Sequence, residues 1–508
     1  TIFQKTWKYY NTGDFYFKMG KYNDAIAQYN KAIETCPKEN IENLAVFYEN
    51  RAAAYEQLKI YSAVKADCTK ALEQNPKYTK ALLRRARVLE QIGDLEAALK
   101  DMTTVCIHEN FSDQSSLLKA DNILEKLVNQ HARENLANKK AVMPNEHFIK
   151  LYIVAFPKDP VFSRLKCPEN IPEFFKKPLQ ALKDKKYDEV IPLCTEIIES
   201  PEFDTLPSTK LEVVLLRATF YTFLNENNSA IHDFESILNT EYASDDVKIN
   251  ALLKRADLHK GLKNKEMVFK DFDLAISINP ACSDIYYHRG LTYVYMHLLT
   301  KAKPDFEKAI VYNPNFSMAY IQKSYTDYQI GILNKDKKLV RTAVKAFEAI
   351  FIKYPTVPEC IYCYVLFRGM MSEIRQYRKA HIYFIKITKR HPYDPSMSFV
   401  YLQRAFLQFD WDNDFDKAMK YLYKSIKLNE KCDAAYKALG TIEIERGNIQ
   451  KAIRLLDKAL IYCRTSKELL NIYHLRDATK VQLDIKNQAG LRYIPQFLLP
   501  FSFRFLHL

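Results

Sequence analysis

Small and aromatic residues recur along this chain in a fixed order and at fixed distances. Counted from Gly290, the pattern places an aromatic residue at +3 and +16, an alanine at +12 and +19 and a proline at +24: Tyr293, Phe306, Ala302, Ala309 and Pro314. The same offsets from Gly13 give the same kinds of residue, and those from Ala52 give most of them. We call the small residue that starts each copy its anchor. Further anchors are Ala86, Ala218, Ala256, Ser324 and Gly440.

The distance between anchors indicates the kind of repeat. Ala52 and Ala86 lie 34 residues apart, as do Ala256 and Gly290, and this is the period of the tetratricopeptide repeat, a pair of antiparallel helices. Small residues let the two helices approach closely, aromatic residues fill the space between pairs, and the proline ends the second helix. One pair cannot bury its apolar face alone, so the pairs must stack into a superhelix with a concave groove. We therefore predict an all-α chain of about ten or eleven repeats.

One segment does not follow the pattern and divides the array into two modules. The text LLKADNILEKL at 117–127 indicates a bridging helix, and the proline-containing stretches after it indicate an irregular linker. The predicted parts are an N-terminal module at 1–110, the bridging segment at 111–178, a C-terminal array at 179–485 and an atypical tail at 486–508.

The composition agrees with helix pairs. Only 10 glycines occur among 508 residues, whereas tight turns between strands and phosphate-binding loops use many. An apolar share of 48% excludes a disordered chain. The net charge of +14 is compatible with nucleic acid, an anionic membrane or acidic peptides, but it is spread along the chain, as on ordinary solvated helix faces. Most of the ten cysteines lie in apolar helical text, which favours free thiols.

The motifs of the common enzyme classes are missing from the sequence. It contains no glycine-rich phosphate loop, no HExxH and no GxSxG. The one CxxC, from Cys360 to Cys363, has no second pair, so packing on a helix is a better explanation than a zinc or redox site. His288 stands in ordinary repeat text and suggests a structural role. We expect a protein-binding chain without catalytic residues, metal or cofactor.

Three polar residues of the N-terminal module form a candidate ligand clamp. Asn50 and Arg84 each lie two residues before an anchor, and Lys80 precedes Arg84 by four residues and so shares its helix face. All three belong to first helices, which line the groove. Together they can hold a peptide's terminal carboxylate and a neighbouring acidic side chain through charge-assisted hydrogen bonds.

The alternative is that these residues are part of the repeat scaffold. An arginine directly before the anchor is scaffold by that criterion, because it recurs at Arg51, Arg85, Arg217, Arg255 and Arg289. The position of Arg84 is more variable, since it holds Asn50, Leu216, Lys254 and His288 elsewhere. A binding role is therefore the better interpretation for Arg84.

Several strings resemble a known family over nearly the whole chain. The chain is similar to the animal seventy-kilodalton import receptors of the mitochondrial outer-membrane translocase, through these stretches: FYENRAAAYEQL (47–58), NPKYTKALLRRA (75–86), VMPNEHFIKLY (142–152), LLRATFY (215–221), YYHRGL (286–291) and KCDAAYKALGTIEIERGNIQKAI (431–453).

This resemblance implies a membrane anchor upstream of Thr1, a body facing the cytosol and contact with other translocase subunits. It also implies an N-terminal clamp for the acidic C-terminal tails of cytosolic heat-shock chaperones, and a C-terminal array that binds preproteins with internal targeting signals, such as carriers. No single preprotein-binding residue can be assigned. The competing interpretations are a soluble co-chaperone scaffold and, on the basic charge alone, an RNA-binding scaffold.

The clamp departs from the family's pattern. The family uses five residues, and Asn50, Lys80 and Arg84 match three of them, while the first-repeat lysine and asparagine align with Tyr10 and Asp14. Asp14 would repel a carboxylate or neutralise Lys80 or Arg84, and Lys8 lies about 200° of helix rotation from position 10. The sequence therefore predicts a weakened or altered chaperone-tail site, in which the Tyr10 hydroxyl could serve as a donor.

Overall fold

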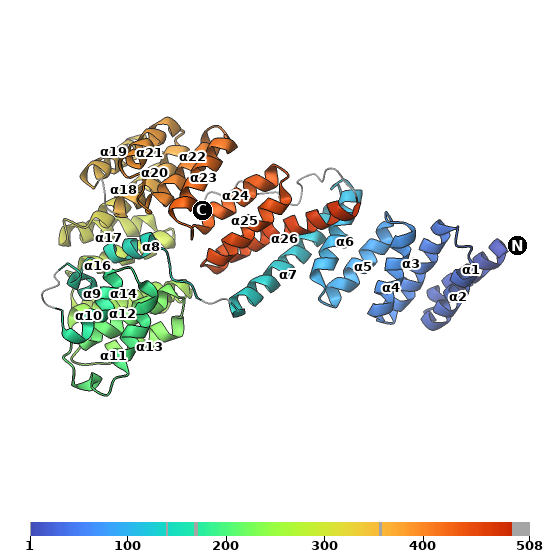
Figure 1. Ribbon diagram of the computed structural model, residues 1–508, viewed down its shortest axis with the longest axis horizontal. Coiled ribbons are helices and arrows are strands. Elements are labelled where there is room, and N and C mark those ends of the chain that lie inside the picture. The colour runs from blue at the N-terminus through green and yellow to red at the C-terminus, as the bar shows by residue number, and fades with distance from the viewer. Residues whose placement is uncertain (1, 139–140, 167–170, 355–357, 490–508) are drawn as a thin grey trace. The chain divides into compact units, whose positions relative to one another are not determined.

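The computed structural model describes residues 2–138, 141–166, 171–354 and 358–489, which form α-helices, short 3-10 turns and loops, with no strand in these ranges. The contacts divide the chain into two compact units (Figure 1). Unit 1 combines residues 1–139 with the chain from residue 433 onward, and unit 2 comprises residues 140–432. The all-α fold predicted from the repeat pattern is confirmed.

Unit 1 contains three consecutive helix pairs, a long single helix, and then a further pair and a second long helix from the C-terminal part of the chain. Its helices are α1 (Ile2–Lys18), α2 (Tyr22–Thr35), α3 (Ile41–Gln57), α4 (Tyr61–Gln74), α5 (Thr79–Gln91), α6 (Leu95–His108), α7 (Gln114–Asn138), α24 (Asp433–Glu445), α25 (Ile449–Tyr462) and α26 (Ser466–Ala489).

Unit 2 begins with two short helices, α8 (Glu146–Val154) and α9 (Pro160–Arg164), and continues as a row of helix pairs. The pairs are formed by α10 (Lys176–Lys183), α11 (Val190–Ile198), α12 (Lys210–Phe223), α13 (Asn227–Leu238), α14 (Asp245–Gly261), α15 (Lys265–Ile278), α16 (Ser283–Tyr295), α17 (Leu299–Tyr312), α18 (Ser317–Leu333), α19 (Lys337–Lys353), α20 (Pro358–Glu373), α21 (Tyr377–Arg390), α22 (Met397–Trp411) and α23 (Phe415–Leu428). Three 3-10 turns precede α10, α11 and α12: η2 (Glu173–Phe175), η3 (Tyr187–Glu189) and η4 (Phe203–Thr205).

The anchors hold the two helices of a pair together. A Cβ added to Gly13 would lie 2.7 Å from the ring of Tyr29, and one added to Gly290 would lie 2.7 Å from the ring of Phe306. In both cases the ring is the aromatic residue at +16, and both rings are almost completely buried. The small anchor is therefore needed because the +16 ring packs directly on the backbone of the first helix.

The arginine before each of five anchors pairs with the same partner position. Each donates to both oxygens of an aspartate 16 residues further on, at 2.6–3.0 Å, in the pairs Arg51–Asp67, Arg85–Asp101, Arg217–Asp233, Arg255–Asp271 and Arg289–Asp305. The aspartates are buried on the second helix of the pair. This two-point geometry suits guanidinium and carboxylate, and it confirms that these arginines are scaffold.

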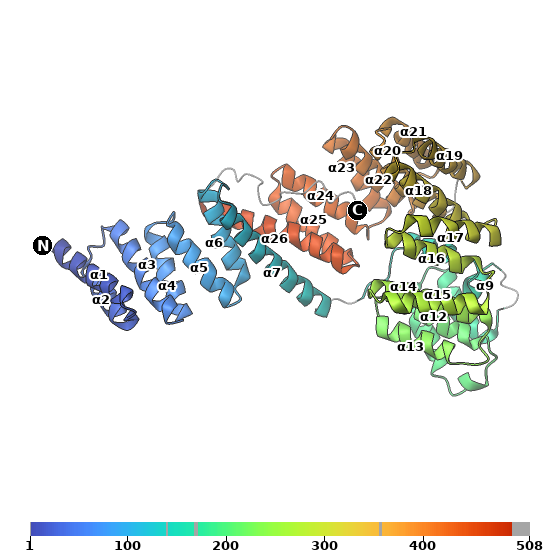
Figure 2. The same cartoon turned by 180° about the vertical axis from the view of Figure 1, so that it is seen from behind.

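The long helix α7 packs beside the C-terminal helix α26 within unit 1 (Figures 1 and 2). His131 lies 2.8 Å from the Asp477 carboxylate, Asn135 donates to the Tyr473 hydroxyl at 3.0 Å, and Lys480 pairs with Glu96 of α6. Residues 433–489 therefore join the N-terminal repeats, whereas the sequence pattern grouped residues 179–485 as one array.

The described part of the segment at 111–178 is more helical than the sequence suggested, since it holds α7, α8, α9 and η2. The eight cysteines that the structure describes are buried, as their apolar sequence context suggested. Cys363 is one of them; Cys167 and the side chain of Cys360 lie outside the described residues, as does the tail from residue 490.

Candidate functional site

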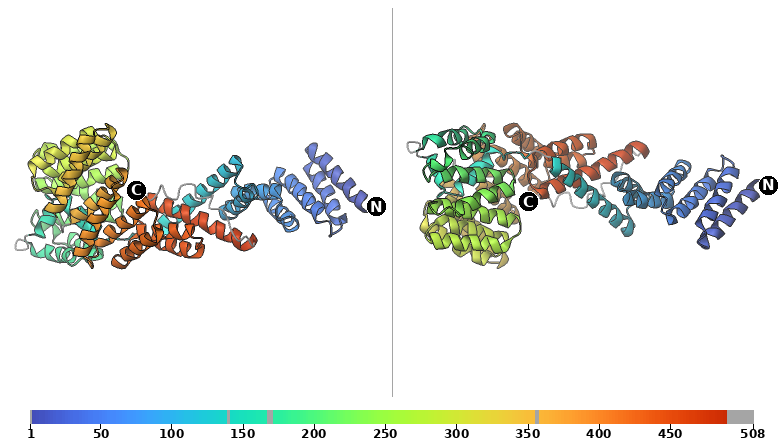
Figure 3. Two further views of the ribbon diagram at one scale, coloured as in Figure 1. Left: turned by 90° about the horizontal axis from the view of Figure 1, so that it is seen from above. Right: turned by 90° about the horizontal axis from the view of Figure 1, so that it is seen from below.

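The clamp residues lie on the first helices of three successive pairs, α1, α3 and α5, which stack in sequence order (Figure 3). Asn50 reaches back from α3 to α1, where its side-chain amide donates to the hydroxyl of Tyr10 at 2.6 Å. Tyr10 is half-buried and packs its ring on Phe47, with the centroids 4.9 Å apart. Tyr10 therefore accepts one of the two N–H groups of the Asn50 amide.

Asp14 has a partner inside its own repeat. The Tyr29 hydroxyl of α2 donates to its carboxylate at 2.7 Å. Burial, and after it the Asp14 carboxylate, raises the pKa of Tyr10, and burial and Asp14 likewise raise the pKa of Tyr29. Both hydroxyls therefore stay protonated at neutral pH, and the first repeat contributes a carboxylate to the groove but no cation.

Arg84 is neutralised within the groove by two glutamates of α3. Its guanidinium donates to Glu49 Oε1 at 3.0 and 3.1 Å and also to the carboxylate of Glu56. Glu49 is buried. The sequence predicted that Asp14 would repel a tail carboxylate or neutralise Lys80 or Arg84. The carboxylates that pair with Arg84 are those of Glu49 and Glu56, which face α5 from the neighbouring helix.

Lys80 is the exposed member of the predicted clamp, and the described residues hold no ion pair that involves it. Nearby, Arg87 pairs with Glu56 at 2.8 Å. Burial, and after it the Glu49 carboxylate, raises the pKa of Tyr78 to about 12, although Arg84 opposes the shift. Among the residues described above, three carboxylates (Asp14, Glu49 and Glu56) stand against three cations (Lys80, Arg84 and Arg87), so their formal charges cancel.

Sequence reasoning missed the two glutamates. Glu49 directly precedes Asn50, and Glu56 follows Glu49 by seven residues, which places both on one side of α3. Acidic residues at this spacing on a helix that also carries a clamp residue were the available signal. Their meaning depends on the distance to Arg84, which only the packing of α3 on α5 determines.

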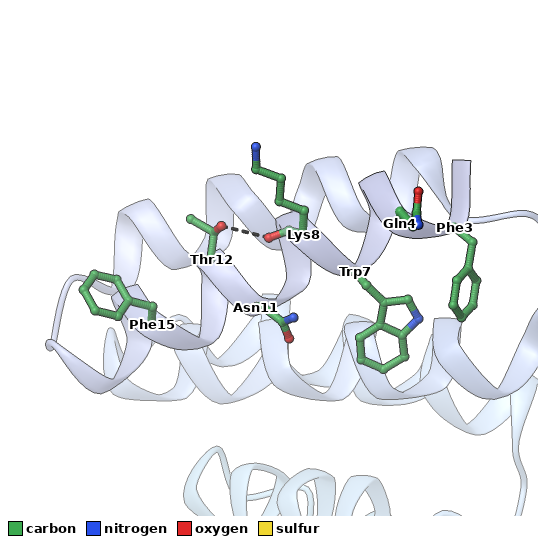
Figure 4. Close-up of a pocket in the computed structure, with 7 residues that line it drawn as sticks. All are labelled: Phe3, Gln4, Trp7, Lys8, Asn11, Thr12 and Phe15. Atoms are coloured by element: carbon green, nitrogen blue, oxygen red, sulfur yellow. Dashed lines mark hydrogen bonds between the residues drawn. The ribbon is translucent and has the colours of Figure 1, made fainter. Parts of the chain in front are cut away.

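Lys8 lies on a different face of α1 from Tyr10. It lines a shallow depression on the outside of this helix together with aromatic and polar side chains: Phe3, Gln4, Trp7, Asn11, Thr12 and Phe15 (Figure 4). The Thr12 hydroxyl donates a hydrogen bond to the backbone carbonyl of Lys8 at 2.8 Å. Lys8 therefore does not replace the missing cation at position 10, as its place in the helix predicted.

The described residues contain no group of three or more His, Cys, Asp or Glu side chains that could hold a metal ion. Among the described helices, none combines the length and the apolar character needed to cross a membrane. His288 is nearly buried, stacks on Phe156 with the ring centroids 4.0 Å apart and bonds the backbone carbonyl of Ala155. It has the structural role that its sequence context suggested.

Stacked helix pairs whose polar side chains converge on the first helices define a protein-binding receptor of the helix-repeat class. The tetratricopeptide-repeat family models match residues 7–39 and 283–316. Over 499 residues the chain is 34% identical to the "Mitochondrial import receptor subunit TOM70" of Homo sapiens and to that of Rattus norvegicus, covering 95% of this chain and 80% of each relative. The chain belongs to this family of mitochondrial import receptor subunits.

A solved structure supports the fold. The crystal structure of yeast Tom70 matches with a TM-score of 0.56 and 22% identity, covering 97% of this chain and 99% of that one. At this level of identity the match shows a shared arrangement of helices and no role for individual clamp residues.

Proposed function

We propose that this chain is a protein-import receptor of the mitochondrial outer membrane, which binds preproteins brought by cytosolic heat-shock chaperones and passes them to the translocase. The observation that carries this proposal is the 34% identity to mammalian import receptor subunits over 95% of the chain. In this proposal the helix repeats face the cytosol, contact other translocase subunits and bind proteins through their grooves, without chemistry of their own.

In this function the groove of α1, α3 and α5 receives the acidic C-terminal tail of a chaperone. Lys80 is exposed and available to a tail carboxylate, and Arg84 and Asn50 stand on the adjacent turns of α5 and α3. The tail competes there with the present partners of the two side chains, since Arg84 bonds Glu49 and Asn50 donates one of its two amide N–H groups to Tyr10. Where the tail displaces such a partner, one hydrogen bond replaces another, so the net gain is small.

The proposal therefore includes a weak chaperone tail site. A tail carboxylate also meets Asp14, Glu49 and Glu56, and like charges within a few ångströms oppose binding. The C-terminal array binds the preprotein, whose internal targeting signals lie in the mature sequence. Because the two activities use different helices, the chain can lose most of its tail affinity and still capture preproteins.

Calorimetric titration with a chaperone C-terminal peptide tests the clamp. For the unaltered chain we expect a Kd in the micromolar range or weaker. For Arg84→Ala we expect the affinity to fall at least tenfold. Lys65→Ala is the matched control, because it removes one positive charge from the exposed surface of a second helix, α4, and should leave the affinity unchanged.

A pull-down with a carrier-type preprotein tests the receptor function separately. Capture of the preprotein by the unaltered chain and by Arg84→Ala alike is the expected result. Absence of tail binding would remove the chaperone clamp from the proposal and leave preprotein capture intact. Absence of preprotein capture would contradict the receptor function itself.

A further inference from the structure

In unit 2, one segment of the chain packs against α12, α14 and α16, the first helices of three successive pairs. Residues 155–164 connect α8 to the end of α9, and α9 packs beside α12 and near α14 (Figure 2). The segment reads AFPKDPVFSR, and Phe156, Asp159, Val161 and Phe162 are buried. It consists of a turn, in which the amide of Asp159 donates to the carbonyl of Phe156 at 3.1 Å, followed by one short helical turn.

The residues that contact this segment occupy the repeat positions of the unit 1 clamp. Asn50 and Arg84 stand two residues before their anchors, and Lys80 stands six before Ala86. In α12, α14 and α16 these two positions hold six residues: Glu212, Leu216, Asn250, Lys254, Asp284 and His288. All but Leu216 bond the segment through their side chains.

The centre of the contact is an ion pair without solvent. Lys254 Nζ donates to Asp159 Oδ2, and the two side chains are 1% and 0% exposed. Thr219 accepts a second hydrogen bond from Lys254 at 2.9 Å. The rings of Phe156 and Phe162 lie 5.2 and 4.9 Å from the ammonium group, so the segment itself supplies the aromatic walls of the site.

The backbone of the segment is recognised as well. His288 Nε2 lies 3.0 Å from the carbonyl oxygen of Ala155, and Asp284 accepts from the amide of Lys158 at 2.9 Å. Asn250 donates to the Lys158 carbonyl at 3.3 Å. Fixed side chains of α14 and α16 therefore bond both the amide and the carbonyl of one residue of the turn.

A second ion pair fixes the far end of the segment. Arg164 donates to Glu212 of α12 at 2.8 Å through Nη2, and its Nε bonds the same carboxylate. Asp159 Oδ1 accepts from the amides of Val161 and Phe162 at 2.8 and 3.1 Å, which starts the helical turn. The segment therefore presents a carboxylate and a guanidinium in a fixed conformation.

We propose that residues 155–164 are a built-in ligand of unit 2, bound at the repeat positions where a helix-repeat receptor binds a client peptide, and that they keep the groove of α12, α14 and α16 closed to preproteins. The closure rests on the proposed receptor function, whereas the binding of the segment does not. A competing peptide would have to supply a buried carboxylate for Lys254, because removal of one partner from a buried ion pair leaves the other charge buried and uncompensated.

A peptide of residues 153–166, added in trans with a fluorescent label, tests the binding. The released variant combines Asp159→Ala with Arg164→Ala, so that its own segment loses both ion pairs. We expect the released variant to bind the peptide at least tenfold more tightly than the unaltered chain does. The same peptide with Asp159→Ala, and the released variant with Lys254→Met, should both fail to bind.

Hydrogen exchange on the unaltered chain gives a second test that does not depend on the folding of a variant. The amides of Lys158, Val161 and Phe162 should exchange slowly, and saturation with a preprotein should leave their rates unchanged. Faster exchange on preprotein binding would overturn the closed groove. Equal peptide affinity for the folded released variant and the unaltered chain would overturn the built-in ligand, whatever the result for preprotein capture.

Discussion

Arg84 and Glu49, which belong to neighbouring first helices, form an ion pair at 3.0 Å in the groove where a chaperone tail is proposed to bind. The Glu49 side chain is 5% exposed and that of Arg84 is 20% exposed. The Arg84 guanidinium has already lost part of its water and gained a carboxylate partner. A tail carboxylate that binds it therefore gains less free energy than it would from an unpaired guanidinium. The pair therefore sets the tail affinity as much as Arg84 alone does.

Glu49→Gln should raise the affinity for an acidic tail peptide. The amide keeps the shape of the side chain and can still accept a hydrogen bond from Arg84, but it removes one negative charge beside the bound tail. We expect a gain of about 1 kcal/mol, or roughly fivefold in Kd, for one charge in a partly screened groove. Calorimetric titration with the peptide measures the change.

Glu73→Gln is the matched control for this prediction. Glu73 is exposed on α4, a second helix, so the same change of charge should leave the affinity as it was. A gain of equal size in both variants would mean that net charge, and not the release of Arg84, is responsible. An unchanged affinity in Glu49→Gln would show that the pair does not limit binding.

Arg85, the residue after Arg84, should affect the stability of the protein and not its affinity for the tail peptide. Arg85→Ala leaves Asp101 buried without its bidentate partner, so we expect the free energy of unfolding to fall by about 3 kcal/mol. Tail affinity of the folded protein should not change, because Arg85 faces the second helix of its own pair. Arg87→Ala is the control: Arg87 is 58% exposed, and loss of its surface pair should cost less than about 1 kcal/mol. Equal destabilisation by the two changes would argue against the scaffold role.

Much of the fold could be predicted because the contacts within a helix pair follow from the spacing of residues within one repeat. The contact of Gly290 with Phe306 follows from a spacing of 16 residues, and so does the pair of Arg289 with Asp305. Both contacts lie within one helix pair, where the length of the connecting loop varies little. Local spacing is then sufficient to predict which residues meet.

The sequence was less informative where contact depends on distant segments. Residues 155–164 interrupt the repeat pattern, so nothing in their spacing indicates that Asp159 meets Lys254, 95 residues further on. The packing of α26 on α7 joins residues more than 300 positions apart for the same reason. The residue types of Asn50, Lys80 and Arg84 were sufficient to predict a candidate ligand site. The partners of Arg84 could not be predicted, because they depend on how α3 packs against α5.

The anchor glycines give a direct test of the close helix approach. Gly290→Ala places a methyl group 2.7 Å from the Phe306 ring, and overpacking of this kind costs about 1–3 kcal/mol. Gly369 lies within α20 with nothing near its added Cβ, so Gly369→Ala should instead stabilise the protein by about 0.5–1 kcal/mol. Denaturant unfolding measures both, and a Gly290→Ala protein as stable as the unaltered chain would show that the ring moves aside at no cost.

His288 makes the stability of unit 2 depend on pH. Burial lowers its pKa from 6.5 to about 4, so between these values the unfolded chain binds a proton that the folded chain does not. The free energy of unfolding therefore falls as the pH drops from above 6.5 towards 4, by about 2 kcal/mol at pH 5 for this one group. Buried Asp284, whose pKa is raised to about 7, contributes a slope of the opposite sign, so the unaltered chain alone cannot isolate the effect.

His288→Gln isolates it, because the amide nitrogen of glutamine can still donate to the carbonyl of Ala155 but does not titrate. The difference in unfolding free energy between the variant and the unaltered chain should be constant above pH 7. At pH 5 it should shift by about 2 kcal/mol in favour of the variant. A difference that stays constant from pH 8 to pH 5 would mean that His288 takes up its proton in the folded chain as readily as in the unfolded one, and that the segment bonded to it is open to water.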